Sequence, residues 1–222
     1  LAMVACPSLR SVRLPLLLTV AMVSLSMSGC TGALLTAMYL IRGNDLPAEF
    51  KGLKDKKVAV VCRPLVGLSY REAGVAQDIA AKVNQNLKAN LRNVTLIEQR
   101  KIAEWTDENT WDEYPEIGKA LGADLVIGID LEEFNLYKGQ TVYEGRASVL
   151  LRVYDCKTGE VVFERHMPPV VYPPNSPKPV AEQPEGAFTR EYVGVVAEHI
   201  ARYFYPHDPY SGFAVDAMAM GK

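Results

Sequence analysis

The first half of the chain alternates between short apolar runs and one long helical pattern. Val58–Cys62 is β-rich and apolar on both faces, which is typical of a central buried strand. From Tyr70 to Leu91 the apolar period becomes helical, and polar residues occupy the opposite side. Its apolar positions are Ala76, Ile79, Ala80, Val83, Leu87 and Leu91. Val94–Glu98 is a second predicted strand, so this unit predicts two parallel strands joined by a right-handed crossover.

A second stretch of helices leads to a third strand. Gln99–Trp105 is predicted to be a short helix, and Glu116–Leu121 another. Pro115 suits the first turn of that second helix because its missing N–H leaves no helical bond unmade. Gly122 can end it in the left-handed conformation. Leu125–Leu131 is the third predicted strand.

The clearest alternation in the chain follows, and it indicates a strand with one buried and one wet face. Ala147, Val149, Leu151 and Val153 point one way, whereas Glu144, Arg146, Ser148 and Arg152 point the other. Lys138-Gly139 is a predicted turn before this strand. Asp155–Gly159 is a predicted hairpin loop after it, with Gly159 supplying a positive φ. Val161–Phe163 is the returning strand, so the second half predicts an antiparallel meander.

The C-terminal third begins with a proline-rich stretch. Seven of the 14 prolines lie within residues 168–184, which favours extended backbone and excludes an interior strand. We interpret residues 168–187 as an exposed spacer, with docking to an aromatic groove of a partner as the alternative. Residues 188–204 again show a helical period, and the apolar face of this predicted helix is too large to remain exposed to solvent. The predicted fold is α/β, with a mixed five-stranded sheet, a parallel strand-helix-strand first half, an antiparallel second half and a C-terminal helix packed on it.

The first 29 residues differ from the rest. Arg10 and Arg13 precede an apolar run that ends in small residues before Cys30, as in a secretory signal peptide. With Gly29 at the cut and Cys30 next, the segment resembles a bacterial lipoprotein signal. The resemblance implies that Cys30 carries a diacylglycerol and that its new amine is acylated, for example with palmitate. Two or three acyl chains anchor a protein stably.

The alternative for the leader is an uncleaved transmembrane helix, because residues 14–41 run without a charge for longer than a bilayer requires. Both interpretations place the remainder outside the cytoplasm, facing the periplasm. Thr31, in place of an aspartate, favours the outer over the inner membrane. The expected organisation is a signal peptide (1–29), a lipidated tether (30–56), an α/β domain (57–167), the Pro-rich linker (168–187), the C-terminal helix (188–204) and a loosely held tail (205–222).

Composition narrows the functions further. The chain has 222 residues and a net charge of −2, so no excess of basic charge indicates nucleic acid. Its four cysteines contain no CxxC pair, which excludes a zinc ribbon. Cys62 and Cys156 are expected to be two separate buried thiols, although an oxidising compartment also permits a disulfide between them.

Few residues of the chain are candidates for catalysis or for binding a metal, cofactor or partner. His166, His199 and His207 lack the spacing of a metal site, and no Gly-rich phosphate loop is present, so we expect no metal, no cofactor and no catalytic residues. Trp105, Trp111 and Tyr114 flank an acidic string and are candidate contacts for a partner. The alternative is that these three aromatics cap the core.

The order of elements resembles one group of bacterial envelope proteins. The group comprises the curli-secretion lipoprotein, the outer-membrane activator of penicillin-binding proteins and the amino-terminal domain of the Tol–Pal β-propeller protein. The resemblance runs over residues 57–164. The parts that carry it are Lys57–Val61, the helix with Ile79, Val83 and Leu87, Leu96–Arg100, Gly118–Gly128 and Val149–Asp155 with Thr158–Val162. It implies a scaffold or adaptor rather than an enzyme. No segment offers the paired strands of about 9–11 residues that a membrane barrel needs, which argues against a pore.

We therefore expect a membrane-anchored, non-catalytic assembly or adaptor module of a cell-envelope complex. The alternatives are a ring-forming secretion component, which would be a homo-oligomer, and an enzyme of unrecognised extracytoplasmic activity.

Overall fold

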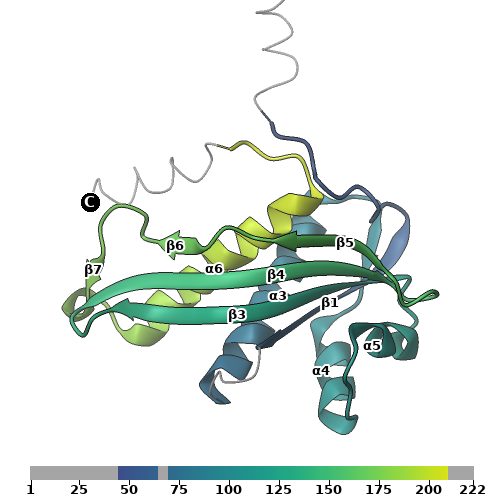
Figure 1. The fold of residues 1–222 in the computed structure, drawn as a ribbon, viewed down its shortest axis with the longest axis horizontal. Helices are drawn as coiled ribbons and strands as arrows, with labels where there is room; N and C mark the ends of the chain where they lie inside the picture. The colour runs from purple at the N-terminus through teal and green to yellow at the C-terminus, as the bar shows by residue number, and fades with distance from the viewer. Residues whose placement is uncertain (1–44, 65–69, 210–222) are drawn as a thin grey trace, which may run out of the picture. The chain divides into compact units, whose positions relative to one another are not determined.

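Strands and helices of the computed structural model follow the predicted order, and the model describes residues 45–64 and 70–209 (Figure 1). The strands are β1 (Lys56–Pro64), β2 (Val94–Leu96), β3 (Leu125–Lys138), β4 (Val142–Asp155), β5 (Val161–His166), β6 (Val170–Tyr172) and β7 (Lys178–Pro179). The helices are α3 (Tyr70–Asn90), α4 (Gln99–Glu108), α5 (Tyr114–Leu121) and α6 (Glu185–Ala201), with short 3-10 turns at Val180–Glu182 and Arg202–Phe204.

The sheet is mixed, as the sequence predicted. Its strand order is β2-β1-β3-β4-β5, with β1 parallel to both β2 and β3, and with β3, β4 and β5 antiparallel. β4 has 14 residues and β5 only six, so β5 covers one end of the outer edge of β4. β6 and β7 pair with the remainder of that edge. The sheet is therefore five strands wide, as predicted, but contains seven strands.

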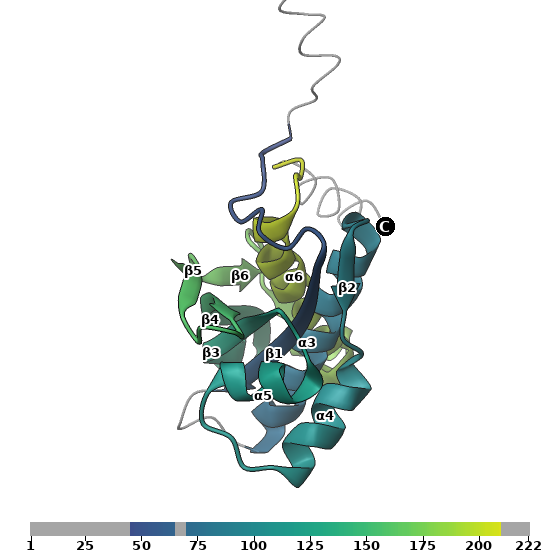
Figure 2. The same ribbon diagram turned by 90° about the vertical axis from the view of Figure 1, so that its right-hand side faces the viewer.

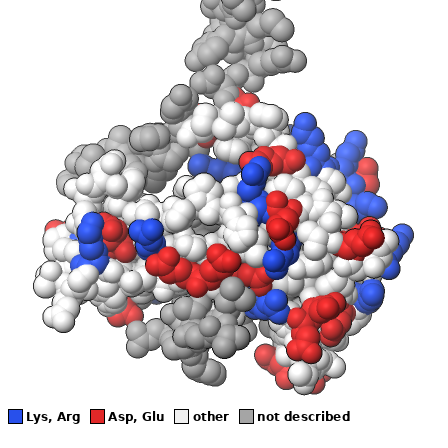
Figure 3. Space-filling model, viewed as in Figure 1, with Lys and Arg blue, Asp and Glu red and all other residues white. Residues whose placement is uncertain are grey.

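Helices cover the two faces of the sheet unequally. α3 and α6 pack side by side on one face, whereas α4 and α5 cover one end of the other (Figures 1 and 2). The larger core lies under α3 and α6 and includes Val149, Leu151 and Val153 from the predicted buried face of β4. A smaller core lies under α4 and α5. The predicted wet face of β4 carries charged side chains of both signs in Figure 3.

Two glycines end elements where the sequence predicted. Gly122 follows α5 with a φ of 65°, and its N–H donates to the carbonyl of Lys119 at 3.2 Å. Gly159 has a φ of 80° in the loop between β4 and β5. Both conformations are ones that glycine adopts without the steric cost of a Cβ atom.

The predicted tether ends earlier than residue 56. Leu53 is only 2% exposed, and the ring of Phe50 lies 5.4 Å from that of Phe163. The Leu46 N–H donates to the carbonyl of His207 at 2.8 Å, and the His207 N–H donates back at 3.1 Å. The folded part of the chain thus includes residues 46–56 and the beginning of the predicted tail. Sequence patterns missed both segments because their buried apolar residues are isolated among polar ones.

The interpretation of residues 168–187 as an exposed spacer is wrong for much of its length. Val170 and Tyr172 are buried, and β6 and β7 hold the segment along β4. β6 and β7 pair with β4 alone, so the expectation that this stretch adds no interior strand is confirmed. α6 begins at Glu185 rather than residue 188, directly after Pro184.

Glu191 of α6 binds two side chains of the proline-rich segment and so holds that segment on the domain. Its carboxylate accepts hydrogen bonds from the hydroxyl of Tyr172 and from Lys178 Nζ, the latter at 2.8 Å. Partial burial acts to raise the pKa of Glu191, but the hydrogen bonds from Lys178 and Tyr172 outweigh it and lower the pKa below the ordinary 4.5. A carboxylate with a lowered folded-state pKa stabilises the fold above its unfolded-state pKa.

We expect residues 172–183 to loosen as the pH falls below about 4.5, because protonated Glu191 no longer holds Lys178. Hydrogen exchange measured from pH 6 to pH 3 checks this. Glu191→Gln should exchange quickly in this segment at every pH. Glu198→Gln, which removes an exposed α6 carboxylate paired with Arg202, should behave as wild type. Equal protection of the segment in Glu191→Gln and wild type would contradict the assignment.

Candidate functional site

Three aromatic residues predicted as partner contacts lie at the end of the sheet that α4 and α5 cover. Trp105 belongs to α4, Trp111 to the loop between the helices, and Tyr114 begins α5. The structure brings Trp111 and Tyr114 together, with their ring centroids 5.6 Å apart, and Trp105 packs against the same smaller core. Tyr114 is 1% exposed, whereas both tryptophans are half-buried. Tyr114 therefore belongs to the core, and the tryptophans lie at its border with solvent.

Arg63 joins these aromatics to the sheet. Its guanidinium lies 4.8 Å from the ring centroid of Tyr114 and 5.7 Å from that of Trp111. Its Nη1 donates to the backbone carbonyl of Asp112 at 2.9 Å, and its Nε donates to Oδ1 of Asp130 at the same distance. One side chain thus holds the α4–α5 loop against β1 and β3. We call Arg63, Trp105, Trp111 and Tyr114 the aromatic corner.

Asp130 is the buried anion beneath the aromatic corner. It is 1% exposed and accepts hydrogen bonds at 2.9 Å from the hydroxyl of Tyr114 and from Nη1 of Arg152, as well as from Arg63. Arg152 also donates to Glu164 at 2.7 Å. A buried carboxylate is costly unless it is paired, and here two guanidinium groups pair it.

These contacts fix the protonation of the groups around Asp130. Burial acts to lower the pKa of Arg63, but its hydrogen bond to Asp130 and the charge interactions with Tyr114, Asp130 and Tyr154 together outweigh burial, so the pKa is raised. Burial raises the pKa of Tyr114, and the negative charge of Asp130 raises it further. Tyr114 therefore stays protonated and acts as a hydrogen-bond donor.

Arg63, Asp130 and Arg152 were missed as site residues by the sequence analysis. Asp130 is the one charge in the apolar run Leu125–Leu131, and that anomaly was available from the sequence. The partners of Asp130 could not be predicted from the sequence, because they depend on the register in which the strands pair. The parallel pairing of β1 and β3 places Arg63 opposite Asp130, and the antiparallel pairing of β3 and β4 brings Arg152 near.

A cleft of about 420 Å³ opens beside the aromatic corner, between α3, α4 and the end of β1. Trp111 and Ile102 contribute apolar surface to it. Its polar lining side chains include Arg63, Gln77, Asp78, Gln99, Arg100 and Thr106. A cleft with apolar and polar groups on rigid elements is suited to holding a side chain or short peptide of a partner.

The rim of the corner is acidic. Asp107, Glu108, Asp112 and Glu113 are all exposed on the end of α4 and the loop that follows it. Figure 3 shows acidic side chains gathered at the lower right, where Figure 1 places α4. This charge favours a partner with a basic surface and makes binding dependent on salt.

The two cysteines of the domain do not form a disulfide. Cys62 packs against the larger core and Cys156 belongs to the smaller one, so the sheet separates them. The expectation of two separate buried thiols is thus met in part, because Cys156 is buried but Cys62 is only partly so. Burial raises the pKa of both thiols, that of Cys156 to about 11, and thereby disfavours a reactive thiolate.

Gly29 and Cys30, the predicted cleavage and lipidation residues, lie outside the described residues. No group of three His, Cys, Asp or Glu side chains suitable for a metal occurs in residues 45–64 and 70–209. Within those ranges no helix has the length and apolarity needed to cross a membrane.

Comparison with known proteins gives remote structural similarities. No family model matches the sequence, and no curated protein matches it. The PelC dodecamer from Paraburkholderia phytofirmans is 14% identical over 72% of this chain and 93% of that one, with a TM-score of 0.42. Lipoprotein GNA1162 from Neisseria meningitidis is 12% identical over 64% of this chain and 96% of that one, with a TM-score of 0.40.

A third similar structure is the LpoB C-terminal domain from Salmonella enterica, 14% identical over 54% of this chain and 84% of that one, with a TM-score of 0.34. Bacterial lipoproteins thus recur among the solved structures similar to this chain, as the sequence resemblance predicted. At these TM-scores the similarity carries no argument about partner or mechanism.

Proposed function

We propose that this chain is an envelope lipoprotein, anchored to a membrane through Cys30, whose domain is a non-catalytic binding module. Its partner surface is the aromatic corner together with the adjacent cleft. The observation that carries this proposal is the position of Arg63, which ties the α4–α5 loop to the sheet through Asp112 and Asp130.

A loop held in this way is preorganised for binding. Side chains that are already ordered lose little conformational entropy when a partner binds. Trp and Arg are also the residues that most often dominate binding energy at protein interfaces. Trp111 is half-buried and packs against Tyr114 with the two rings tilted by 50°, so it can present a fixed apolar surface at the mouth of the cleft.

The charges around Asp130 support a structural rather than a catalytic role. Its carboxylate oxygens accept from Arg63, Tyr114 and Arg152, so the anion is engaged in holding elements together. The raised pKa of Tyr114 removes it as a base near neutral pH. The outward-facing groups of the corner are an aromatic ring and an acidic rim, which suit recognition.

Site-specific photocrosslinking in cells tests the proposal. A benzophenone amino acid is placed at Thr110, an exposed residue of the α4–α5 loop, and in a control at Lys157, an exposed residue of the β4–β5 loop. We expect a discrete adduct with another envelope protein from Thr110 and none from Lys157. The adduct should weaken at high salt and be lost in Trp111→Ala, provided that circular dichroism shows that variant to be folded.

Equal adducts from both positions, or an adduct that persists in folded Trp111→Ala, would contradict the assignment of the corner. Adducts joining two copies of this chain would instead indicate the ring-forming alternative, in which the module binds itself.

A further inference from the structure

The strand β5 (Val161–His166) forms the outer edge of one end of the sheet (Figure 1). Among the residues that the structure describes, β5 pairs with β4 alone, so no strand lies beside its other edge. Every residue of β5 except Phe163 is exposed to solvent. An uncovered edge strand is a template on which a further strand can pair through backbone hydrogen bonds. We call this the β5 edge.

The pairing of β5 with β4 determines which backbone groups of the β5 edge point outward. In an antiparallel pair, residues that bond to the neighbouring strand alternate with residues whose backbone groups point away from it. Directly after β5, the Met167 N–H donates to a carbonyl of β4 at 3.0 Å. Arg165 and Phe163 lie at steps of two residues before Met167 in the same register, so they also bond to β4. The N–H and C=O groups of Glu164 and His166 consequently point outward.

Apolar side chains lie at the beginning of the β5 edge. Val161 is 46% exposed and Val162 is 47% exposed, and they are two of the four large hydrophobic side chains exposed in the described part of the chain. The register with β4 shifts here: Tyr154 lies opposite Val161 and Val153 opposite Phe163, so Val162 has no partner on β4. The backbone groups of Val162 are therefore also open to another strand, which would remove its side chain from water.

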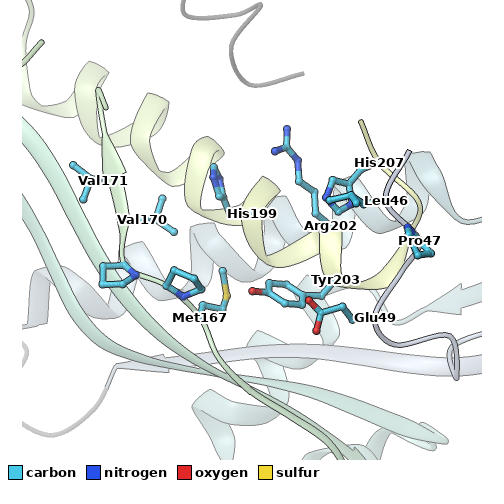
Figure 4. Close-up of a pocket in the computed structure, with 12 residues that line it drawn as sticks. Leu46, Pro47, Glu49, Met167, Val170, Val171, His199, Arg202, Tyr203 and His207 are labelled. Carbon is cyan, nitrogen blue, oxygen red and sulfur yellow. The ribbon is translucent and has the colours of Figure 1, made fainter. Parts of the chain in front are cut away.

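One face of β5 packs against the domain, which fixes the strand in place. The ring of Phe50 lies 5.4 Å from that of Phe163, and Glu49 forms an ion pair with Arg165. In Figure 4 Glu49 lies beside Tyr203, so the segment before β1 runs along the side of the domain where α6 ends. The Phe50 N–H donates to the carbonyl of Tyr203 at 3.0 Å rather than to β5, which leaves the β5 edge uncovered.

A second copy of this chain fits the β5 edge. Two identical strands can pair antiparallel around a two-fold axis when residues with outward backbone groups face each other. An axis at Glu164 would set two carboxylates directly opposite each other, and an axis at Arg165 would oppose two guanidinium groups. Like charges that lie directly opposite are destabilising. An axis at Phe163 sets Glu164 opposite Val162 of the second copy and opposes no like charges.

The axis at Phe163 also brings two aromatic rings together. Phe163 is half-buried, and its ring lies near those of Phe50 and Phe204, with the Phe204 centroid 6.4 Å away. Residues that face each other without mutual backbone bonds have the closest side chains in an antiparallel pair. The second Phe163 would therefore extend this aromatic cluster across the axis, and such ring contacts stabilise an interface.

We propose that two copies of this chain pair their β5 strands antiparallel around a two-fold axis at Phe163, which joins their sheets into one. The contact uses the same surface on both copies, so it closes at two chains and differs from a ring. The inference is independent of the proposed binding role, since it rests on the β5 edge and not on the aromatic corner.

A matched pair of substitutions at Glu164 tests the proposal in the full-length protein, purified in detergent. Glu164→Pro removes an N–H that points outward, so it costs no hydrogen bond to β4. Glu164→Ala removes the same carboxylate, and with it the ion pair to Arg152, but keeps the N–H. Sedimentation equilibrium should show dimers of wild type and of Glu164→Ala. We expect Glu164→Pro, folded by circular dichroism, to weaken the dimer at least about ten-fold, because two interchain hydrogen bonds are lost.

The other outcomes of this measurement overturn the proposal. A monomeric wild type at all concentrations would mean that the β5 edge does not pair with itself. Equal dimerisation of folded Glu164→Pro and Glu164→Ala, or a larger assembly that persists in Glu164→Pro, would mean that the chains associate through another surface.

Disulfide trapping tests the register without the proline variant. Full-length Val162→Cys is mixed with Glu164→Cys, and the matched control mixes Val171→Cys, at an exposed valine of β6, with Glu164→Cys. Under mild oxidation we expect at least about five-fold more 162–164 disulfide between chains than 171–164 disulfide, since only the first pair lies within bonding distance. Mass spectrometry of the joined peptides measures both. Equal yields, or a 164–164 disulfide that exceeds the 162–164 product, would overturn the axis at Phe163.

Discussion

Replacing Asp130 by Asn should lower the free energy of unfolding by about 2–3 kcal/mol, because it leaves two guanidinium groups without their buried anion. We expect a smaller loss of unfolding free energy than for a fully enclosed ion pair, because the side chains of Arg63 and Arg152 remain 35% and 28% exposed. Urea unfolding at pH 7 measures it. The emission of Trp111 should also shift to the red as Arg63 loosens, with Trp111→Phe used to subtract the signal of Trp105.

Glu164→Gln is the matched control for Asp130→Asn. It also removes an anion bound to Arg152, but Glu164 is half-exposed, so we expect a loss of at most about 1 kcal/mol. If Asp130→Asn were as stable as Glu164→Gln, the buried carboxylate would not organise the aromatic corner.

Gly145→Ala should lower the free energy of unfolding by about 2–3 kcal/mol, because the added methyl group overpacks the larger core. A Cβ atom at Gly145 would lie 2.7 Å from three ring atoms of Tyr192. That ring cannot easily move, since its hydroxyl donates to the carbonyl of Val170 at 2.7 Å and Phe134 packs at 5.3 Å. Differential scanning calorimetry gives the change.

The same substitution at Gly194 is the control. This glycine is inside α6, and a Cβ atom there would meet nothing within 4 Å. Gly194→Ala should therefore raise the free energy of unfolding by about 0.5–1 kcal/mol, through the higher helix propensity of alanine. A stabilising Gly145→Ala would show that the ring of Tyr192 does not occupy the position described.

The regular part of the fold was predictable from the sequence. The two-sided apolar pattern of Val58–Cys62 identified the central strand, and the alternation from Glu144 to Val153 identified the long strand with one wet face. Pro115 and Gly122 marked the ends of α5 correctly because each has one strong conformational preference.

The misplaced segments share a physical cause. Residues 46–56, the proline-rich stretch and Tyr205 are held by single apolar side chains and by backbone pairing with partners far along the chain. Such contacts leave no local periodicity. Composition correctly indicated that prolines exclude an interior strand, but it gave no sign that the outer edge of β4 was free to pair.

The site was predictable only in part. Trp105, Trp111 and Tyr114 stood out as aromatics near acidic residues, and the structure places all three at the smaller core. Arg63 and Asp130 acquire their roles from the pairing of β1 with β3, which single-sequence patterns do not specify. The sequence therefore indicated which aromatics to examine, and the register identified the ion pair that orders them.

Lipidation of Cys30 is the central claim of this account, and metabolic labelling tests it most directly. Cells expressing the tagged wild-type chain or Cys30→Ala are grown with a radioactive fatty acid, and the mature amino terminus is then analysed by mass spectrometry. The account predicts label and membrane fractionation for wild type alone, with Cys30 as an acylated first residue. Equal label in Cys30→Ala, or an unmodified peptide that extends upstream of Cys30, would contradict it.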